Sequence, residues 1–206
     1  MKALGLNGGV QLGCRTNTDG MPYLASQRFS PPVHLSKPYY DEYTGALLIN
    51  LSCPTAGLLS GDRMICDIEV SDEASMVVTT PGATRSHCMR SGIAKVDQKF
   101  RVSDDSFLEF NPGPLILQKS TSLEQNTLIE KAGNAEVLYV EKMLPGRLAH
   151  GEIFEFSKFS NRLRIQKDQQ LILLENFNLD PQNNSVYPWQ NSFPSPFYGC
   201  FYLISP

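Results

Sequence analysis

Two glutamates interrupt otherwise apolar strand patterns, and these are the residues of the chain best placed to do chemistry. Within residues 135–144 (AEVLYVEKML), Glu141 alternates in phase with Tyr139 and Met143, and both faces of the pattern are apolar. A buried carboxylate must be paired, hydrogen-bonded, protonated or facing a wet cavity, because an isolated buried charge is too costly. A second glutamate repeats the pattern: Glu175 shares its predicted face with Leu171, Leu173, Phe177 and Leu179.

Further acids lie beside glycines in predicted turns. Asp62 follows Gly61, and Glu152 comes directly after Gly151 and shortly after the turn Pro145-Gly146-Arg147. Gly146 and Gly151 flank Arg147, where the missing Cβ permits a positive φ or a close backbone approach. Two interpretations fit these acids. They line an interior, or they form structural salt bridges to Arg147, Arg162 or Arg164.

Several common catalytic motifs are missing from the sequence. Gly8 and Gly13 have the spacing of a phosphate-binding loop, but Cys14 stands where that loop requires lysine. The sequence contains neither G-x-S-x-G nor H-E-x-x-H. His87 and Cys88 are adjacent, so on a strand they point to opposite faces and do not form a nucleophile–base pair. The three histidines show no spacing typical of a zinc site.

The elements that position these residues are predicted to be short β-strands. Lys95–Val102 shows the clearest alternation, with Lys95 and Asp97 among the outward residues and Gln98 as a polar exception on the inner face. Turn signals recur roughly every 8–12 residues, which is typical of a sandwich, barrel or solenoid. Residues 180–198 are rich in proline and asparagine and are expected to be irregular. The predicted strands are 10–16, 22–29, 46–53, 64–70, 74–80, 95–102, 106–110, 114–118, 127–131, 135–144, 152–156, 162–166, 170–179 and 199–206.

Composition limits the class of protein. The 206 residues predict a single domain spanning 1–206, and the net charge of -3 argues against a nucleic-acid binder. No apolar run is long enough to span a membrane, and the N-terminal residues lack the continuous apolar region of a signal peptide. Five widely spaced cysteines without a C-x-x-C pair indicate reduced thiols, and hence a cytoplasmic protein.

A set of short motifs resembles the urease accessory protein D family, which is called H in some bacteria. No motif is specific alone, but they occur in the family's order. They are, along the chain, 31–35 (PPVHL) before 38–40 (PYY), 58–62 (LLSGD), 79–84 (TTPGAT), 107–116 (FLEFNPGPLI) and 146–152 (GRLAHGE).

The resemblance implies an all-β fold with very few helices, in which many short strands form a stacked, solenoid-like arrangement. It also implies a protein that is not an enzyme. Family members bind accessory protein F, reach the GTPase accessory protein G through F, and act on apo-urease. They give Ni²⁺ an internal path to urease and hold no tightly bound cofactor. The family's important acids correspond to Asp62, Glu141 and Glu175, with Thr84 at a small hydroxyl position.

Carboxylates suit transient Ni²⁺ binding, because they favour divalent cations but hold Ni²⁺ less tightly than thiolate or imidazole clusters. The sequence departs from the family in three places. Residues 85–90 (RSHCMR) keep a basic residue but lose a tyrosine, and Phe110-Asn111 replaces a tryptophan-leucine pair. The family's usual C-terminal tail beyond the equivalent of Pro206 is missing from this sequence.

Two other functions fit parts of the pattern. A β-solenoid or β-sandwich carbohydrate-active enzyme could use Glu141 and Glu152 as acid and base, in an open cleft lined by aromatic side chains. The chain's only tryptophan, Trp189, lies in the irregular segment, which weakens that interpretation. A plain interaction module, in which every acid is structural, would have no continuous polar interior.

Overall fold

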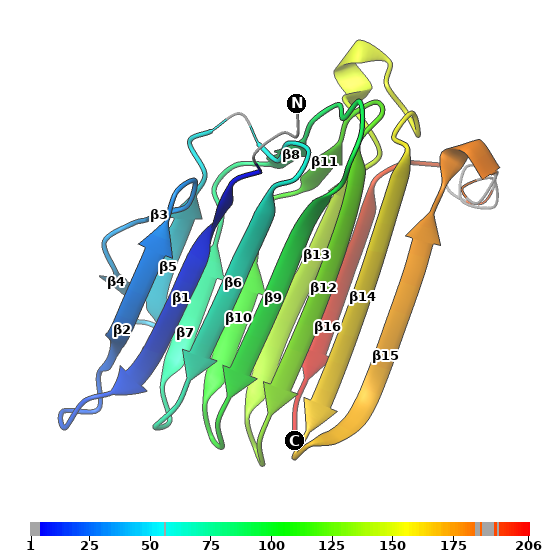
Figure 1. The fold of residues 1–206 in the computed structure, drawn as a ribbon. Helices are drawn as coiled ribbons and strands as arrows, with labels where there is room; N and C mark the ends of the chain where they lie inside the picture. The colour runs from blue at the N-terminus through cyan, green and yellow to red at the C-terminus, as the bar shows by residue number, and fades with distance from the viewer. Residues whose placement is uncertain (1–4, 56, 184–185, 187–191, 193) are drawn as a thin grey trace.

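The computed structural model describes residues 5–55, 57–183, 186, 192 and 194–206, and β-strands dominate it (Figure 1). Trp189 lies outside the described residues. Two short 3-10 helices, η1 (Leu148–His150) and η2 (Pro181–Asn183), interrupt the strands. The strands are β1 (Asn7–Thr16), β2 (Pro22–Ser30), β3 (His34–Leu35), β4 (Tyr39–Tyr40), β5 (Leu47–Ser52), β6 (Arg63–Val70), β7 (Ser75–Thr79), β8 (Thr84–Ser86), β9 (Ala94–Val102), β10 (Phe107–Asn111), β11 (Leu115–Leu117), β12 (Ser122–Lys131), β13 (Glu136–Leu144), β14 (Lys158–Lys167), β15 (Gln170–Leu179) and β16 (Tyr198–Ile204).

The strands form two sheets that face each other (Figure 1). The first has the order β15-β14-β12-β9-β6-β1-β2, and the second has the order β3-β5-β7-β10-β13-β11-β8, with β4 beside β5 and β16 beside β13. From β6 to β14 the chain passes back and forth between the sheets, and the strands added in successive passes pair in parallel. Each pass adds one long strand to the first sheet, and the first two passes add two short strands to the second sheet, β7 with β8 and β10 with β11. The predicted all-β, stacked, solenoid-like fold is confirmed.

Antiparallel strands stand at the margins of this parallel stack. The hairpin partner β2 pairs with β1 across the turn that contains Asp19 and Gly20, and β15 pairs with β14. In the second sheet, β16 runs antiparallel along almost the whole of β13. No helix among the described residues has the length and apolarity needed to cross a bilayer.

The strand β13 is central, as its two apolar faces predict. It pairs with β10 and then β11 along one edge and with β16 along the other. Val137, Tyr139, Glu141 and Met143 are all at most 7% exposed, so this alternate set faces the other sheet. The ring of Tyr139 lies 5.8 Å from that of Phe100 on the opposite sheet, between centroids. The core therefore occupies the space between the sheets, and Glu141 lies inside it.

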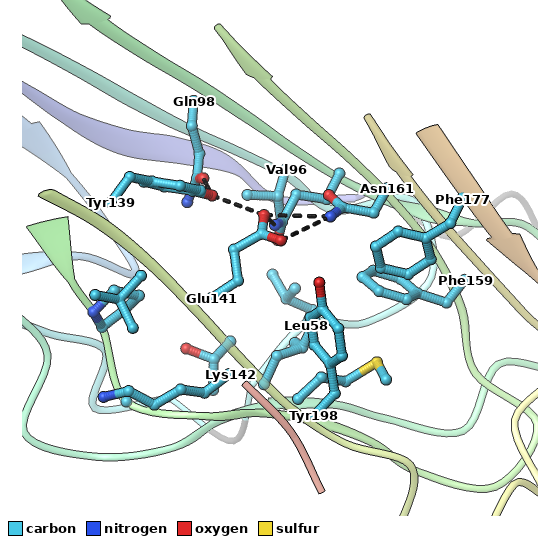
Figure 2. A pocket seen from close by; sticks show the side chains of 17 residues that line it. Leu58, Val96, Gln98, Tyr139, Glu141, Lys142, Phe159, Asn161, Phe177 and Tyr198 are labelled. Atoms are coloured by element: carbon cyan, nitrogen blue, oxygen red, sulfur yellow. Dashed lines mark hydrogen bonds between the residues drawn. The ribbon is translucent and has the colours of Figure 1, made fainter. Parts of the chain in front are cut away.

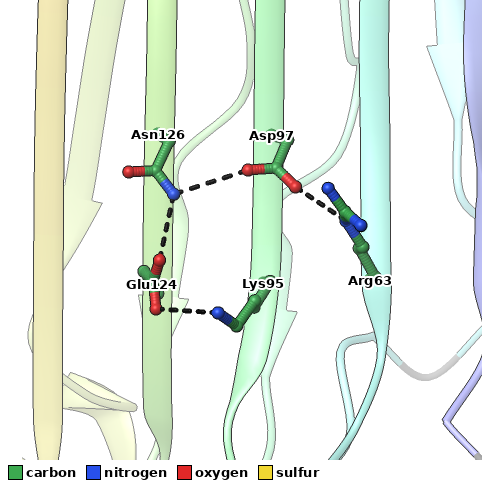
Figure 3. A network of polar contacts seen from close by, with 5 residues as sticks. All are labelled: Arg63, Lys95, Asp97, Glu124 and Asn126. Atoms are coloured by element: carbon green, nitrogen blue, oxygen red, sulfur yellow. Dashed lines mark hydrogen bonds and ion pairs between the residues drawn. The ribbon is translucent and has the colours of Figure 1, made fainter.

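The outer face of the first sheet is covered by charged side chains (Figure 3). Arg63 and Asp97 form an ion pair at 2.8 Å, and Lys95 and Glu124 form another at 3.2 Å. The amide of Asn126 donates to Glu124 of the same strand at 3.1 Å and to Asp97 of the neighbouring β9 at 3.4 Å, so it joins the two ion pairs. Parallel pairing aligns these positions in rows, and the predicted outward phase of Lys95 and Asp97 is confirmed.

The prediction of a strand at residues 152–156 is wrong. Glu152, Phe154 and Phe156 are buried and alternate with exposed residues, as in a strand, but the segment pairs with no described strand. Phe154 has φ +55°, outside the β region, and its amide donates to the carbonyl of Pro145 rather than to a sheet. Alternating burial alone does not show whether a partner strand is available.

The predicted face of β15 is right for most of its length and wrong at Leu171. The β14–β15 register shifts beside Ile165, where Ile172 has no partner, so the phase of β15 reverses there. Leu171 is consequently 50% exposed, whereas Leu173 and Glu175 point inward.

Candidate functional site

The site begins with Glu141, whose carboxylate is surrounded by neutral hydrogen-bond donors (Figure 2). The amide of Asn161 donates to both carboxylate oxygens, at 3.2 Å and 3.0 Å. The amide of Gln125 donates to Oε1 at 3.3 Å, and the Tyr139 hydroxyl donates to it at 3.0 Å. No described lysine or arginine forms an ion pair with Glu141. The carboxylate is therefore solvated by dipoles and not neutralised by a cation.

Strand register explains why these donors meet. Gln125 on β12 is paired with Asn161 on β14, and the next inward position, Thr127, is paired with Gln98 on β9. The Thr127 hydroxyl donates to Gln98 Oε1 at 2.9 Å, and the Tyr139 hydroxyl lies at the same distance from that oxygen. The first sheet thus supplies four polar side chains opposite Tyr139 and Glu141 of the second. This continuous polar interior is not what a plain interaction module would show.

Glu175 reaches the same interior from β15. The hydroxyl of Tyr202 on β16 donates to Glu175 Oε2 at 2.7 Å. Tyr202 is paired with Tyr139, and the centroids of the two rings lie 6.0 Å apart, so β16 and β13 present these tyrosines side by side. As at Glu141, no ion pair joins Glu175 to a described cation.

The surroundings of Glu141 raise the pKa of its carboxyl. Burial is the largest cause, and the nearby charge of Glu175 adds to it, while the donors from Asn161, Tyr139 and Gln125 oppose it. Burial and the adjacent Glu141 likewise raise the pKa of the Tyr139 hydroxyl well above its usual range. A divalent cation would relieve both effects, because it offsets the negative charge of the two acids.

Two cavities adjoin this polar interior. The smaller, of about 100 Å³, is lined by Gln125, Glu141, Asn161 and Thr84, among others. The larger, of about 430 Å³, lies beside β5–β8 and also has Thr84 in its wall. Both are lined by Leu58, Thr84, Val96, Gln98 and Pro112, so the two cavities are neighbours.

Asp62 lies apart from these cavity walls. Its carboxylate accepts the amide N–H groups of Leu6 and Leu59, each at 2.8 Å. It thereby fixes the loop that carries Leu58, a residue of both cavity walls. In this structure Asp62 therefore holds the wall in place from outside.

Arg147 and Glu152 form the structural salt bridge that the sequence allowed. Arg147 Nε donates to Glu152 Oε2 at 2.9 Å, and Nη2 also contacts Oε1. The guanidinium holds the pKa of Glu152 at about 2. Gly146 has φ +151°, and a Cβ there would lie 2.2 Å from the Glu152 carbonyl oxygen, while Gly151 has φ +75° in open space. Both glycines are thus required by the backbone, as the turn predicts.

The family model of the UreD urease accessory protein matches residues 6–206. The chain belongs to this family. Urease accessory protein UreD of Opitutus terrae is 35% identical over 168 residues, which are 82% of this chain and 62% of the relative. UreH of Helicobacter hepaticus is 31% identical over 173 residues, covering 84% and 68%. UreH of Helicobacter pylori is 27% identical over 179 residues, covering 86% and 66%. The chain therefore spans about two thirds of these curated relatives, and the resemblance seen in the motifs is confirmed.

Within this UreD family member, the described residues contain no cluster of three or more histidine, cysteine or acidic side chains that could hold a metal ion. Asp62, Glu141 and Glu175 are consequently not one coordination site. Glu141 and Glu175 share the interior, Thr84 lies on the cavity walls, and Asp62 acts at a distance. Their roles toward nickel stay a prediction.

The acid–base pair of the carbohydrate-active alternative is not assembled in this UreD family member. Glu141 lines the smaller cavity, whereas Glu152 is bound to Arg147 and is not part of that wall. A carboxylate whose pKa is held near 2 is also a weak proton acceptor, so Glu152 is poorly suited to the role of general base.

Sequence reasoning missed four polar residues of this interior: Gln125, Thr127, Asn161 and Tyr202. The signal that identified Glu141 could have found most of them. Asn161 alternates in phase with Phe159 and Leu163, and Thr127 with Leu123, all of which are buried. Uncharged side chains in such positions are as informative as acids, because each also needs a hydrogen-bond partner.

Proposed function

We propose that this UreD family member is a non-catalytic component of urease maturation that passes Ni²⁺ between its two sheets toward apo-urease. One observation carries the proposal: Glu141 and Glu175 lie in the polar interior without a cationic partner among the described residues. A structural acid in such a place would normally be matched by a lysine or arginine, as Glu152 is by Arg147.

The chemistry of this interior fits transit and not storage. Carboxylate, amide and hydroxyl oxygens bind divalent cations, but they hold Ni²⁺ less tightly than imidazole or thiolate clusters would. A path needs sites that favour entry and still release the ion. Neighbouring cavities with shared walls at Thr84 and Leu58 continue the interior space toward β5–β8 and support a route in that direction.

The names of the relatives support a role beside other proteins. We expect accessory protein F to bind directly, the GTPase accessory protein G to join through F, and the complex to act on apo-urease. The outward face of β16 offers a surface feature consistent with a partner, because Phe201 and Leu203 are 69% and 70% exposed. Rows of large apolar side chains on a soluble surface commonly mark protein–protein contacts.

The proposal is tested with Glu141→Gln, Glu175→Gln and the double variant. Glutamine keeps the shape of the side chain and removes the charge that attracts Ni²⁺. We expect folding and complex formation to survive while nickel-dependent urease activation falls, with the largest loss in the double variant. Glu130→Gln is a matched control, because Glu130 pairs with Lys99 on the outer face of the first sheet, away from the polar interior. It should leave urease activation unchanged.

The stability of Glu141→Gln separates transit from a structural role. The pKa of Glu141 is raised in the folded state, so ionisation at neutral pH opposes folding, and stability is lost as pH rises through that pKa. A neutral replacement should therefore leave the melting temperature at pH 7 unchanged or higher. Normal activation by the double variant would refute the passage, and loss of fold together with activity would favour a structural role.

A further inference from the structure

Two arginines on the outer face of the first sheet have no acidic partner. Arg162 and Arg164 of β14 are exposed, and Leu163 between them is buried, so both guanidinium groups lie on the solvent side of the sheet. No acid among the described residues forms an ion pair with either arginine. Of the three arginines that the sequence offered as partners for structural acids, Arg147 alone has such a partner in the described part of the chain.

The central strands of this face show the ordinary arrangement, in which cations are matched by acids of a neighbouring strand (Figure 3). Lys95 of β9 pairs with Glu124 of β12 at 3.2 Å. Lys99 of β9 pairs with Glu130 of β12 at 2.9 Å. Arg101, also on β9, pairs with two acids of β6. Because the acids of β12 are engaged by β9, the arginines of β14 need an acid from their other side.

The neighbour on that side, β15, offers leucines instead of acids. It lies at the margin of the sheet, and its one acid, Glu175, points inward. Leu174 is paired with Arg164, and Leu171 lies farther along β15. The two leucines are 55% and 50% exposed. Together with Arg162 and Arg164 they form the β14–β15 patch, in which two unpaired cations lie beside exposed apolar side chains.

We infer that the β14–β15 patch is the docking surface for an acidic segment of a partner protein, one that presents two carboxylates beside apolar side chains. Each guanidinium can hold a carboxylate through two parallel hydrogen bonds. Arg162 and Arg164 are two positions apart on one strand, so their Cα atoms lie about 6–7 Å apart. Carboxylates at alternate positions of an extended segment, or about one turn apart on a helix, match this spacing. Apolar side chains of the same segment cover the leucines.

Charge complementarity favours a protein over a polyanion as the occupant. The chain as a whole carries a net charge of -3, so nucleic acid and anionic membranes are repelled at long range. A partner segment brings its carboxylates on a short stretch of chain and largely avoids that repulsion. The leucines add a second requirement, because a phosphate backbone offers nothing apolar to cover them. The patch belongs to the first sheet, whereas the exposed face of β16 belongs to the second, so this surface goes beyond the proposed function.

The test selects ligands from a random peptide library displayed on phage. The library is panned on the purified full chain and counter-selected on the Arg162→Gln, Arg164→Gln double variant. Recovered peptides should carry paired acids at the spacing given above, together with large apolar residues. Synthetic copies should bind the double variant about tenfold more weakly than wild type, as expected for two partly exposed ion pairs worth several-fold each. Their affinity for wild type should fall as ionic strength rises.

The matched control is the double variant Arg28→Gln, Lys37→Gln. Both residues are exposed cations without an ion-pair partner among the described residues, and neither lies on β14 or β15. This variant removes the same net charge, so it should bind the selected peptides almost as wild type does. Leu171→Ser with Leu174→Ser should weaken binding several-fold. All these side chains are exposed, so we expect unchanged melting temperatures. In NMR titrations of the full chain, the peptides should shift amides of β14 and β15 and leave those of β1 and β2 in place.

Two results would overturn the inference, and neither depends on nickel or on urease activation. Selection that yields no peptide dependent on the two arginines would remove the docking surface, as would peptides that bind the control variant and the arginine variant equally. Tighter arginine-dependent binding of a single-stranded oligonucleotide or of phosphatidylserine vesicles, at the same salt concentration, would overturn the assignment to a protein partner.

Discussion

Glu141 and Glu152 lie eleven positions apart in one stretch of chain, yet their surroundings move their pKa values in opposite directions. Glu152 meets the guanidinium of the partly exposed Arg147, so its charged form is favoured. Glu141 meets only neutral dipoles between the sheets and a second acid nearby, so its charged form is disfavoured. Residue type alone does not distinguish the two roles, and the nearest partner decides between them.

The Glu152 salt bridge predicts a particular dependence of stability on pH. Its folded-state pKa of about 2 lies below the value of about 4.3 expected in an unfolded chain. The stabilisation is therefore complete above the unfolded pKa and is lost as pH falls toward 2. Glu152→Gln should be less stable than wild type at pH 7, and the difference in unfolding free energy should shrink below about pH 4. Denaturant unfolding at several pH values measures this, and a constant difference would contradict it.

At the scale of elements, strand phase predicted which residues face inward but not which segments pair. The strands around Glu141 and Glu175 follow their alternation, because burial on one face is a local property of the sequence. Residues 152–156 alternate equally well and form no strand, because pairing depends on a neighbouring backbone. The reversal of phase at Ile172 arises from an extra residue in the β14–β15 pairing, which alternation cannot reveal.

The same limit applies to the polar interior. Glu141, Glu175 and Gln98 stood out individually as polar residues in apolar phases. Their common location required the register of several strands, which brings Thr127 to Gln98 and Asn161 to Gln125. The sequence thus identified individual residues of the site, whereas the pairing of the strands shows that these residues lie together.

The turn after β13 contains two glycines, Gly146 and Gly151, that differ in the space available for a side chain. Gly146→Ala places a Cβ within 2.2 Å of a backbone oxygen, so the segment must shift, and we expect a loss of about 2–4 kcal/mol. Gly151→Ala meets open space and only a left-handed backbone, so we expect a loss of about 1–2 kcal/mol. Chemical denaturation compares the pair. Equal losses would show that the close approach at Gly146 does not constrain the turn.

At the scale of the whole molecule, the proposed function requires partners. We expect the purified chain to hydrolyse neither glycosides nor esters, because Glu141 and Glu152 share no cavity wall. Co-expressed accessory protein F should co-purify with it. Substituting both Phe201 and Leu203 with serine tests whether the exposed face of β16 contributes, since these side chains are largely solvent-exposed in the chain alone. Robust turnover of a glycoside or ester by the isolated chain would overturn the non-catalytic assignment.

The pairing of β16 with β13 has a consequence for the order of folding. The edge of β13 that β16 covers stays open until the ribosome has also made β14 and β15. Tyr202 cannot reach Glu175 before then, so the polar interior closes after most of the stack has been synthesised. In refolding experiments with pulsed hydrogen exchange, amides of β16 should gain protection after those of β6, β9 and β12. A nascent chain would therefore expose its acid-lined interior to the surrounding solution, and to any metal ion in it, until β16 docks.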